Sequence, residues 1–241
     1  MVHKIQTICH RGANEYAPEN TYAAAKLCID WGMDYVEIDV STSKDEVLYL
    51  LHGPDVDRTT NGTGRIAEFD SVQIDVLDAG SWFDSSFSDE RVPRLVPFLR
   101  WIKGQAKVYF DLKFADIQNV IEHVYDIGLE KDCFFWFRNN ESALELRRLA
   151  PDFPLKINVD CLDDVIVAHE QYGAQIIEIR LDKMSEEIQD LCRELGIKVM
   201  IYHKEKDPEA FRQILEWKVD LVNLNHGDVF ARVADDFYES E

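Results

Sequence analysis

The chain has 241 residues, 46% of them hydrophobic and 30% charged, which is the composition of an ordinary globular protein. Its 46 acidic and 26 basic residues give a formal net charge of −20, and this negative field makes nucleic acid and anionic membranes poor candidates as partners. The N-terminus lacks the apolar core of a signal peptide, and no apolar run approaches the ~18 residues of a membrane span, so we expect a cytoplasmic protein without stable membrane association.

The first predicted strand, residues 5–9, ends abruptly in His10, Arg11 and a glycine. A polar loop then leads to a predicted helix over residues 21–32. Proteins of the α/β class keep their active sites at the C-terminal ends of strands, where an imidazole is a titratable base and a guanidinium offers forked donors to a phosphate. A lone histidine in this position is more often a structural polar residue. A catalytic role for His10 is therefore supported only if other candidate site residues lie beside it.

The second predicted strand, residues 35–40, carries two carboxylates on one face. Glu37 and Asp39 alternate with apolar residues and lie about 7 Å apart at the usual rise per residue of a strand. Hard divalent cations such as Mg²⁺ and Ca²⁺ prefer carboxylate oxygens of this kind. Structural ion pairing is the commoner explanation of such a pair taken alone, so metal binding depends on a further ligand.

A third apolar stretch, residues 46–52, follows too closely to be the next parallel strand. About six residues separate it from the strand before, whereas a parallel crossover needs a dozen or more. We therefore predict an antiparallel return around residues 43–45, which brings His52 opposite Glu37. A second histidine would then lie beside the carboxylates.

From residue 93 onward, predicted helices and strands alternate, which indicates βα units and a parallel sheet. Strands are expected at residues 107–113, 133–137, 155–159, 175–181, 198–203 and 220–225. Helices are expected at residues 93–104, 116–128, 140–150, 161–173, 185–196 and 207–217. With the two earlier strands the count is eight, which predicts an α/β fold of the closed TIM (β/α)8 barrel type.

Polar residues alternate with apolar ones in several of these strands, as in the wall of a barrel with a charged mouth. In the third barrel strand, Asp111 and Lys113 share a face and add a third carboxylate and a cation. Lys156 alternates in the same way in the fifth strand, and Glu178 and Arg180 in the sixth are expected to form an ion pair within the wall. An open doubly wound sheet would bury both faces and tolerate fewer such charges.

The chain shows no sign of a division into two domains, because a linker, a low-complexity tract and a clear repeat are all missing. We therefore expect one domain over residues 1–241. The five cysteines are scattered and lack CxxC spacing, so we interpret them as reduced core thiols of a cytoplasmic protein and not as a disulfide framework or a zinc site.

Two histidines, three carboxylates and two cations are thus expected at one barrel mouth. A pair of imidazoles can share base and acid duties in a displacement at phosphorus. Arg11 and Lys113 supply positive charge of the kind that binds a phosphate. Trp136 and Tyr202 line the substrate pocket or belong to the core, and the sequence leaves both possibilities open.

With these motifs the sequence resembles the glycerophosphodiester phosphodiesterase family. The motifs are HRG with APENT within residues 10–21, VEIDV at 36–40, LLHGPDVDRTTNGTG at 50–64, VPRL at 92–95, YFDLK at 109–113 and VDLVNLNHGD at 219–228. The resemblance spans nearly the whole chain. It implies a TIM barrel with an inserted segment, residues 53–92, between barrel strands 2 and 3, and we expect this segment to extend over the C-terminal mouth.

The resemblance also implies an activity and a role for each candidate residue. The protein would hydrolyse a small-molecule glycerophosphodiester to sn-glycerol 3-phosphate and an alcohol, with one divalent cation, Mg²⁺ or Ca²⁺. The implied residues are His10 and His52 as the acid/base pair, Glu37, Asp39 and Asp111 as metal ligands, Arg11 and Lys113 at the phosphate, and Tyr202 against the glycerol.

Four departures from the usual family pattern bear on the substrate and the metal. Gly53 replaces an Asp, Asp111 replaces a longer Glu, Tyr202 replaces a Trp, and NLNHGD replaces a closing Thr-Asp-x-Pro. Two alternatives stay open: a lysophospholipid-directed phosphodiesterase with a lipid-binding rim in the inserted segment (Trp82, Phe83 and Phe87), and a phosphodiester-binding protein without turnover. The nucleophile (water or the glycerol 2-hydroxyl), the preferred alcohol and the oligomeric state also stay open.

Overall fold

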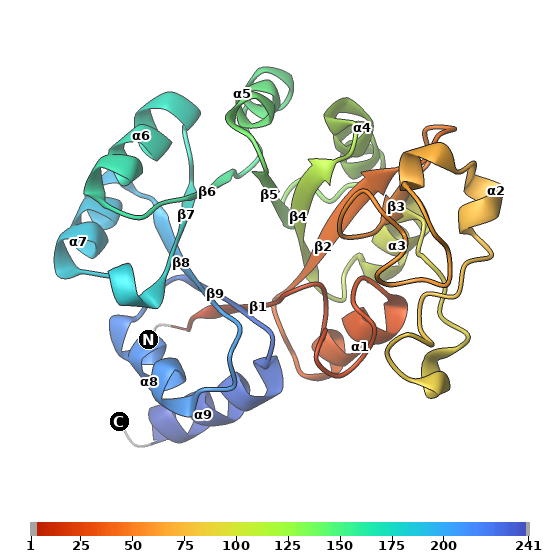
Figure 1. Ribbon diagram of the computed structural model, residues 1–241. Helices are drawn as coiled ribbons and strands as arrows, with labels where there is room; N and C mark the ends of the chain where they lie inside the picture. Colours follow the sequence, from red (N-terminus) through yellow and green to blue (C-terminus); the bar gives the residue numbers. More distant parts are fainter. Residues whose placement is uncertain (1–3, 240–241) are drawn as a thin grey trace.

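A nearly closed barrel of parallel strands, surrounded by helices, makes up most of the computed structural model, which describes residues 4–239 (Figure 1). The barrel strands are β1 (Gln6–Cys9), β2 (Tyr35–Thr42), β4 (Lys107–Phe114), β5 (Cys133–Phe137), β6 (Lys156–Asn158), β7 (Ile176–Ile179), β8 (Lys198–His203) and β9 (Leu221–Leu224). Their spatial order is β5-β4-β2-β1-β9-β8-β7-β6, and a bridge between Phe135 and Leu155 brings the two ends of the sheet together. The predicted TIM barrel is confirmed.

Helices connect the strands and cover the outside of the barrel (Figure 1). They are α1 (Tyr22–Asp30), α3 (Leu95–Ile102), α4 (Ile117–Ile127), α5 (Asn140–Leu149), α6 (Leu162–Tyr172), the short η3 (Leu181–Lys183), α7 (Glu186–Leu195), α8 (Pro208–Trp217) and α9 (Gly227–Glu239). Polar side chains accept backbone N–H groups at the starts of several helices, among them Thr21, Asp116 and Ser185. The last helix, α9, was not among the predicted ones, although its buried Val229, Phe230 and Val233 have helical spacing.

A short strand, β3 (Leu48–Leu50), turns back along β2. It pairs with β2 in the antiparallel sense, with Val40 opposite Leu50 and Thr42 opposite Leu48. The antiparallel return predicted from the short connection is therefore confirmed. Because this register carries the chain back along β2, His52 returns to the barrel mouth, where the C-terminal ends of the parallel strands meet.

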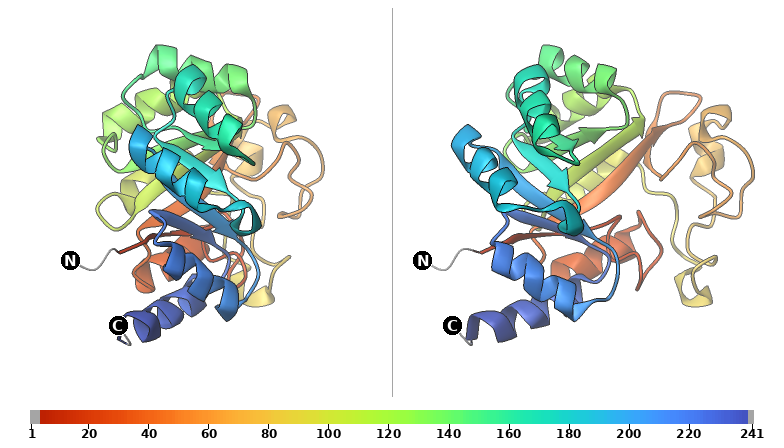
Figure 2. Two further views of the ribbon diagram at one scale, coloured as in Figure 1. Left: turned by 90° about the vertical axis from the view of Figure 1, so that its left-hand side faces the viewer. Right: turned by 60° about the vertical axis from the view of Figure 1, so that its left-hand side comes forward.

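Residues 53–92 leave the barrel after β3 and rejoin it before α3. They contain η1 (Ile66–Glu68), α2 (Ser71–Ile74) and η2 (Ser85–Phe87). Figure 2 shows this segment beside the barrel, at the end toward which the strands point. A small separate core holds it together, made of Tyr49, Leu51, Val56, Ile66, Ile74, Ala79 and Val92.

The barrel interior has an apolar floor and a polar mouth. Inward-facing side chains of seven strands form the floor: Ile8, Tyr35, Tyr109, Phe134, Ile176, Met200 and Leu221. One step further along the strands the inward side chains are polar, as with Glu37 after Tyr35 and Asp111 after Tyr109. Because strand side chains alternate between faces, the residues between them, such as Val36 and Phe110, pack under the helices.

Two further features bear on the sequence expectations. Four of the five free cysteines are buried, whereas Cys161 is exposed, so the expectation of core thiols is wrong for that residue. Within residues 4–239, no helix combines the length and the apolar character needed to cross a bilayer.

Gly12, which follows the His10-Arg11 pair, lies against α1 with φ +76°. A Cβ at this position would lie 2.7 Å from Ala24 Cβ and 2.9 Å from the backbone carbonyl carbon of Ala24. Gly12→Ala should therefore lower the free energy of unfolding, measured by urea denaturation, by more than the ~1–2 kcal/mol that a left-handed backbone alone costs. Gly32→Ala is the matched control, because Gly32 has φ +71° and nothing within 4 Å. Equal losses in both variants would show that the contact with α1 is immaterial.

Candidate active site

β1 places the imidazole of His10 at the barrel mouth among polar side chains. Nδ1 lies 2.9 Å from Asn225 Oδ1 and 3.4 Å from the hydroxyl of Tyr202, and Nε2 lies 3.9 Å from Glu37 Oε2. The amide Nδ2 of Asn14 lies 3.2 Å from the same Nδ1. A proton on Nδ1 would satisfy the amide oxygen of Asn225 and leave Nε2 as an acceptor, whereas an unprotonated Nδ1 would accept from Asn14. Burial, assisted by the charge of Arg11, lowers the pKa of His10 to about 4. The ring is therefore neutral at neutral pH.

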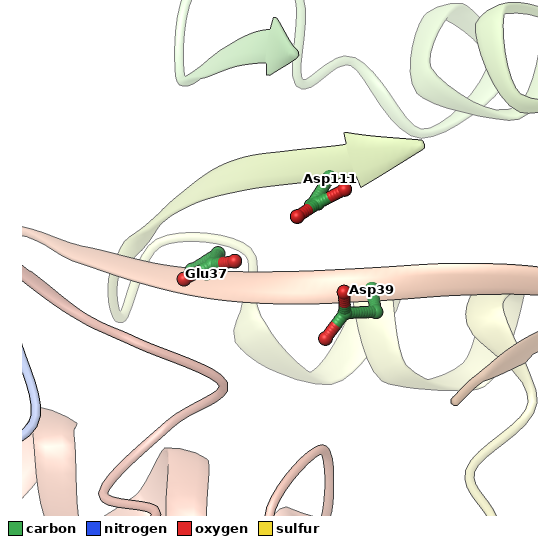
Figure 3. A group of neighbouring side chains, drawn as sticks. All are labelled: Glu37, Asp39 and Asp111. Atoms are coloured by element: carbon green, nitrogen blue, oxygen red, sulfur yellow. The ribbon is translucent and has the colours of Figure 1, made fainter. Parts of the chain in front are cut away.

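The three predicted carboxylates lie together on two neighbouring strands. β2 and β4 pair in parallel with Asp39 beside Asp111, and Glu37 lies two residues earlier on the same face of β2. Figure 3 shows the three carboxyl groups as one cluster. One oxygen of each lies within 4.8 Å of the other two, and all three residues are buried.

The electrostatics of this cluster indicate a missing positive charge. Burial, followed by repulsion from Asp39, raises the pKa of Glu37 and of Asp111 to about 8. Burial opposes ionisation of Asp39 as well, but Lys113 and Arg11 hold its pKa below the usual value. Asp111 Oδ1 is buried without a hydrogen-bond partner among residues 4–239. Three carboxylates with an unpaired oxygen fit a hard divalent cation, so this cluster could bind one.

Two cations converge on Asp39 from different strands. Lys113 Nζ lies 2.9 Å from Asp39 Oδ1 and 2.5 Å from Asp111 Oδ2. Arg11 Nε lies 3.4 Å from Asp39 Oδ2, and Arg11 donates from its terminal nitrogen to Glu19 (3.3 Å). Both side chains are 16–19% exposed, so they are accessible from the mouth.

The second histidine, His52, also lies near the carboxylate of Asp39. His52 Nε2 lies 4.0 Å from Asp39 Oδ1. The expectation that His52 faces Glu37 is therefore wrong, because its neighbour is Asp39, the next residue on the same face of β2. β3 ends at Leu50, opposite Val40, so His52 lies two residues beyond the paired strand. Gly53 follows with φ +102°, a conformation that strains any L side chain, so the glycine that departs from the family pattern is fitted to this turn.

Several residues that hold the site were not singled out as site residues from the sequence. The side chain of Asn20 donates to Asp39 Oδ2 (2.9 Å) and accepts the backbone N–H of Asp39 (3.0 Å). Glu19 accepts from both terminal nitrogens of Arg58 (2.7 and 2.5 Å), and Asn223 donates to Glu37 Oε2 (3.1 Å). Glu19 and Asn20 lie in the APENT motif, which was the one available signal.

A cavity of about 130 Å³ opens beside the carboxylates, toward β5–β9. Its polar lining includes His10 and Glu37, and its aromatic lining includes Trp136 and Tyr202, so the interpretation of these two rings as pocket residues is the one the geometry favours. Lys156 also lines the cavity, with Nζ 3.2 Å from Glu178 Oε2.

The predicted ion pair between Glu178 and Arg180 does not form. β7 ends at Ile179, so Arg180 lies beyond the strand and turns outward. Its guanidinium donates to Asp182 (2.9 and 2.8 Å) with a 71% exposed side chain. Glu178 pairs instead with Lys156 of the neighbouring strand.

Known proteins resemble this chain in sequence and in structure. The sequence model of the Glycerophosphoryl diester phosphodiesterase family matches residues 10–159. The Bacillus subtilis protein YhdW is 36% identical over 157 residues, which cover 62% of this chain and 64% of that relative. The match therefore spans just under two thirds of the relative's own length.

Two solved structures have the same fold over nearly the whole chain. Glycerophosphodiester phosphodiesterase from Agrobacterium tumefaciens strain C58 is 39% identical, with a TM-score of 0.92 over 95% of this chain and 100% of that chain. A phosphodiesterase from Oleispira antarctica, solved in complex with the product sn-glycerol-3-phosphate, is 23% identical, with a TM-score of 0.84 over 95% of this chain and 96% of that chain. Because the family match covers more than half of the sequence, the chain belongs to the Glycerophosphoryl diester phosphodiesterase family.

Proposed function

We propose that this protein hydrolyses glycerophosphodiesters to sn-glycerol 3-phosphate and an alcohol. The observation that carries the proposal is the convergence of His52, Arg11 and Lys113 around the buried carboxylate of Asp39. His10 lies beside Glu37, which is on the same face of the same strand as Asp39. The Agrobacterium relative is named for this activity, and the Oleispira relative binds the product that we expect here.

We propose further that Glu37, Asp39 and Asp111 hold one divalent cation, Mg²⁺ or Ca²⁺. The support is the all-oxygen donor set, the unpaired Asp111 Oδ1 and the raised pKa values of two of the carboxyl groups. A cation bound there would neutralise charge on the phosphoryl oxygens of the substrate.

The charge balance of the mouth suits a singly charged substrate. Ionised, four carboxylates face three cations and leave one net negative charge, which one divalent ion would convert to one net positive charge. A phosphodiester carries one negative charge and would balance it. The groups counted are Glu37, Asp39, Asp111 and Glu178 against Arg11, Lys113 and Lys156.

In the proposed reaction the two histidines move the protons. His10 is neutral, and with its ring proton on Nδ1 against Asn225 its Nε2 accepts the proton of the attacking oxygen, from either water or the glycerol 2-hydroxyl. That oxygen bonds to phosphorus, the phosphorus–oxygen bond to the alcohol breaks, and His52 donates a proton to the departing alkoxide. Arg11 and Lys113 bind the phosphoryl oxygens. Attack by the glycerol hydroxyl first gives a cyclic phosphate, which water then opens.

We propose that the whole chain acts as one domain, in the cytoplasm, on a small soluble diester. Tyr49 of β3 belongs to the core of residues 53–92, and Arg94 beside α3 pairs with Asp75 of that segment, so the inserted segment and the barrel are packed together. A lysophospholipid substrate is the competing candidate, because the ring of Trp82 in this segment is 41% exposed and packs edge-on against Phe83.

His10→Ala and His52→Ala should each lower kcat for glycerophosphocholine about a hundredfold or more, the scale of losing a general acid or base. Steady-state kinetics measures the loss, and circular dichroism checks the fold. His123→Ala on α4, away from the mouth, is the matched control and should keep wild-type kcat. A histidine whose alanine variant keeps near-normal kcat has no part in the proton transfers.

Glu37→Gln should weaken Mg²⁺ binding and activity together, because it removes one charged ligand of the three. In the wild-type protein, Mg²⁺ affinity measured by calorimetry should rise between about pH 6 and pH 8, as protons leave the two carboxyl groups of raised pKa. Glu205→Gln, an exposed acid on the loop after β8, is the control. Full activity of Glu37→Gln in chelator would mean that these carboxylates are structural.

Glycerophosphocholine and glycerophosphoethanolamine should release sn-glycerol 3-phosphate, detected with a coupled dehydrogenase. Lysophosphatidylcholine should be hydrolysed much more slowly, because a chain of net charge −20 without a basic amphipathic helix gains little at a lipid surface. A higher kcat/KM for the lysolipid would favour the competing candidate and give the exposed ring of Trp82 a role in lipid binding.

A further inference from the structure

Lys156 is a buried cation at the barrel mouth. It has no part in the proposed proton transfers, phosphate contacts or metal cluster. Its side chain is 2% exposed, and its ammonium donates to Asn158 Oδ1 (2.7 Å) and lies 3.2 Å from Glu178 Oε2. The ring centroids of Trp136 and Tyr109 lie 4.9 and 5.5 Å from Nζ. An ammonium fixed by two acceptors and two aromatic faces is held in one place.

The cavity that Lys156 lines also contains an unpaired acceptor. Asn223 of β9 is 3% exposed and donates its Nδ2 to Glu37, while its Oδ1 is buried without a hydrogen-bond partner among residues 4–239. An ammonium has three N–H donors, of which Asn158 and Glu178 take two. One donor on β6 and one acceptor on β9 therefore line the same small cavity.

This combination fits a hydroxyl group, which both donates and accepts a hydrogen bond. A buried acceptor without a partner is costly, so a ligand that supplies the missing donor gains binding energy there. Of the two ends of a diester such as glycerophosphocholine, the glycerol end carries two hydroxyls and the choline end carries none.

The dimensions of the cavity limit what can enter it. Its volume of about 130 Å³ is well above the ~10–15 Å³ that one water molecule needs. The apolar floor beneath it, with Met200 and Phe134 among its side chains, is fully buried and leaves no passage deeper into the barrel. A glycerol fits this space, whereas a long acyl chain on that glycerol would have to turn back through the mouth.

We propose that Lys156 and Asn223 form a subsite for the free hydroxyls of the glycerol end, with Glu178 as the positioning residue of Lys156, and that this subsite selects free glycerol over acylated glycerol. The inference rests on the proposed function and deepens it. In this subsite Lys156 donates to a glycerol hydroxyl, and Glu178, which also lines the cavity, fixes the position of Lys156.

The test compares two ligands that share a phosphate and differ in the glycerol. Calorimetry measures the Kd of sn-glycerol 3-phosphate and of inorganic phosphate in the presence of Mg²⁺, for the wild-type protein and for Lys156→Met. We expect the Kd of sn-glycerol 3-phosphate to rise about 10–100-fold, the scale of hydrogen bonds to a charged group, and that of phosphate to change less than about threefold. Lys204→Met, at an exposed lysine of the same mouth, should change neither Kd.

Because Lys156→Met leaves the buried Glu178 unpaired and can destabilise the barrel, the double variant Lys156→Met/Glu178→Gln removes both charges and should show the same selective loss. Glu178→Gln alone should raise KM for glycerophosphocholine with little change in kcat. Bis(p-nitrophenyl) phosphate, a diester without glycerol hydroxyls, should lose less kcat/KM in the double variant than glycerophosphocholine does.

An equal loss for both ligands, or no loss for either, would overturn the subsite, because the pair would then act on phosphate or on folding alone. Failure of the proposed function would give a different result. The wild-type protein would then release no sn-glycerol 3-phosphate from glycerophosphocholine. The ratio of the two Kd values in the variants does not depend on that result.

Discussion

The candidate site depends on one buried negative charge, the carboxylate of Asp39. It is 2% exposed, so it stays ionised only because Lys113, Arg11 and Asn20 compensate the loss of water. Removing one partner of a buried charge typically costs ~3–5 kcal/mol, which ties the positions of these cations to that of the carboxylate. The groups proposed to bind phosphate are thereby held within 3.4 Å of a group proposed to bind the metal. An arriving phosphate would share its cations with Asp39, so substrate and metal binding are expected to be coupled.

The position of Asp39 follows in turn from how β2 pairs on each side. Parallel pairing with β4 sets Asp39 beside Asp111, and the register shifts after Val40, where β2 turns to its antiparallel partner β3. That partner carries His52 back to the mouth. A slip of one residue in either pairing would turn every side chain of the strand to the opposite face and separate the carboxylates from the histidine.

Most of the barrel could be predicted from the sequence, because alternation within strands and alternation of strands with helices are local patterns. The carboxylate cluster was predictable for the same reason, since inward-facing residues of neighbouring strands meet at one mouth. The individual ion-pair partners were not predictable: Glu178 pairs with Lys156 because β6 and β7 align Asn158 with Glu178, and no local pattern contains that register. In the sequence, Arg180 follows the same alternation of polar and apolar residues as Glu178, but it lies past the last residue of β7.

The overall charge of −20 and the cationic groups of the mouth act over different distances. At physiological salt the Debye length is about 8 Å, so the acidic surface repels anions mainly near the protein, whereas charges buried in the barrel are screened much less. A bilayer of anionic lipids presents many charges to that surface at once, and the repulsion adds up over the whole contact. A small diester presents one, and under the proposed function it would meet Arg11 and Lys113 once it had entered the mouth. The surface thus works against extended anions, while the mouth, once a cation occupied the proposed metal site, would favour a single one.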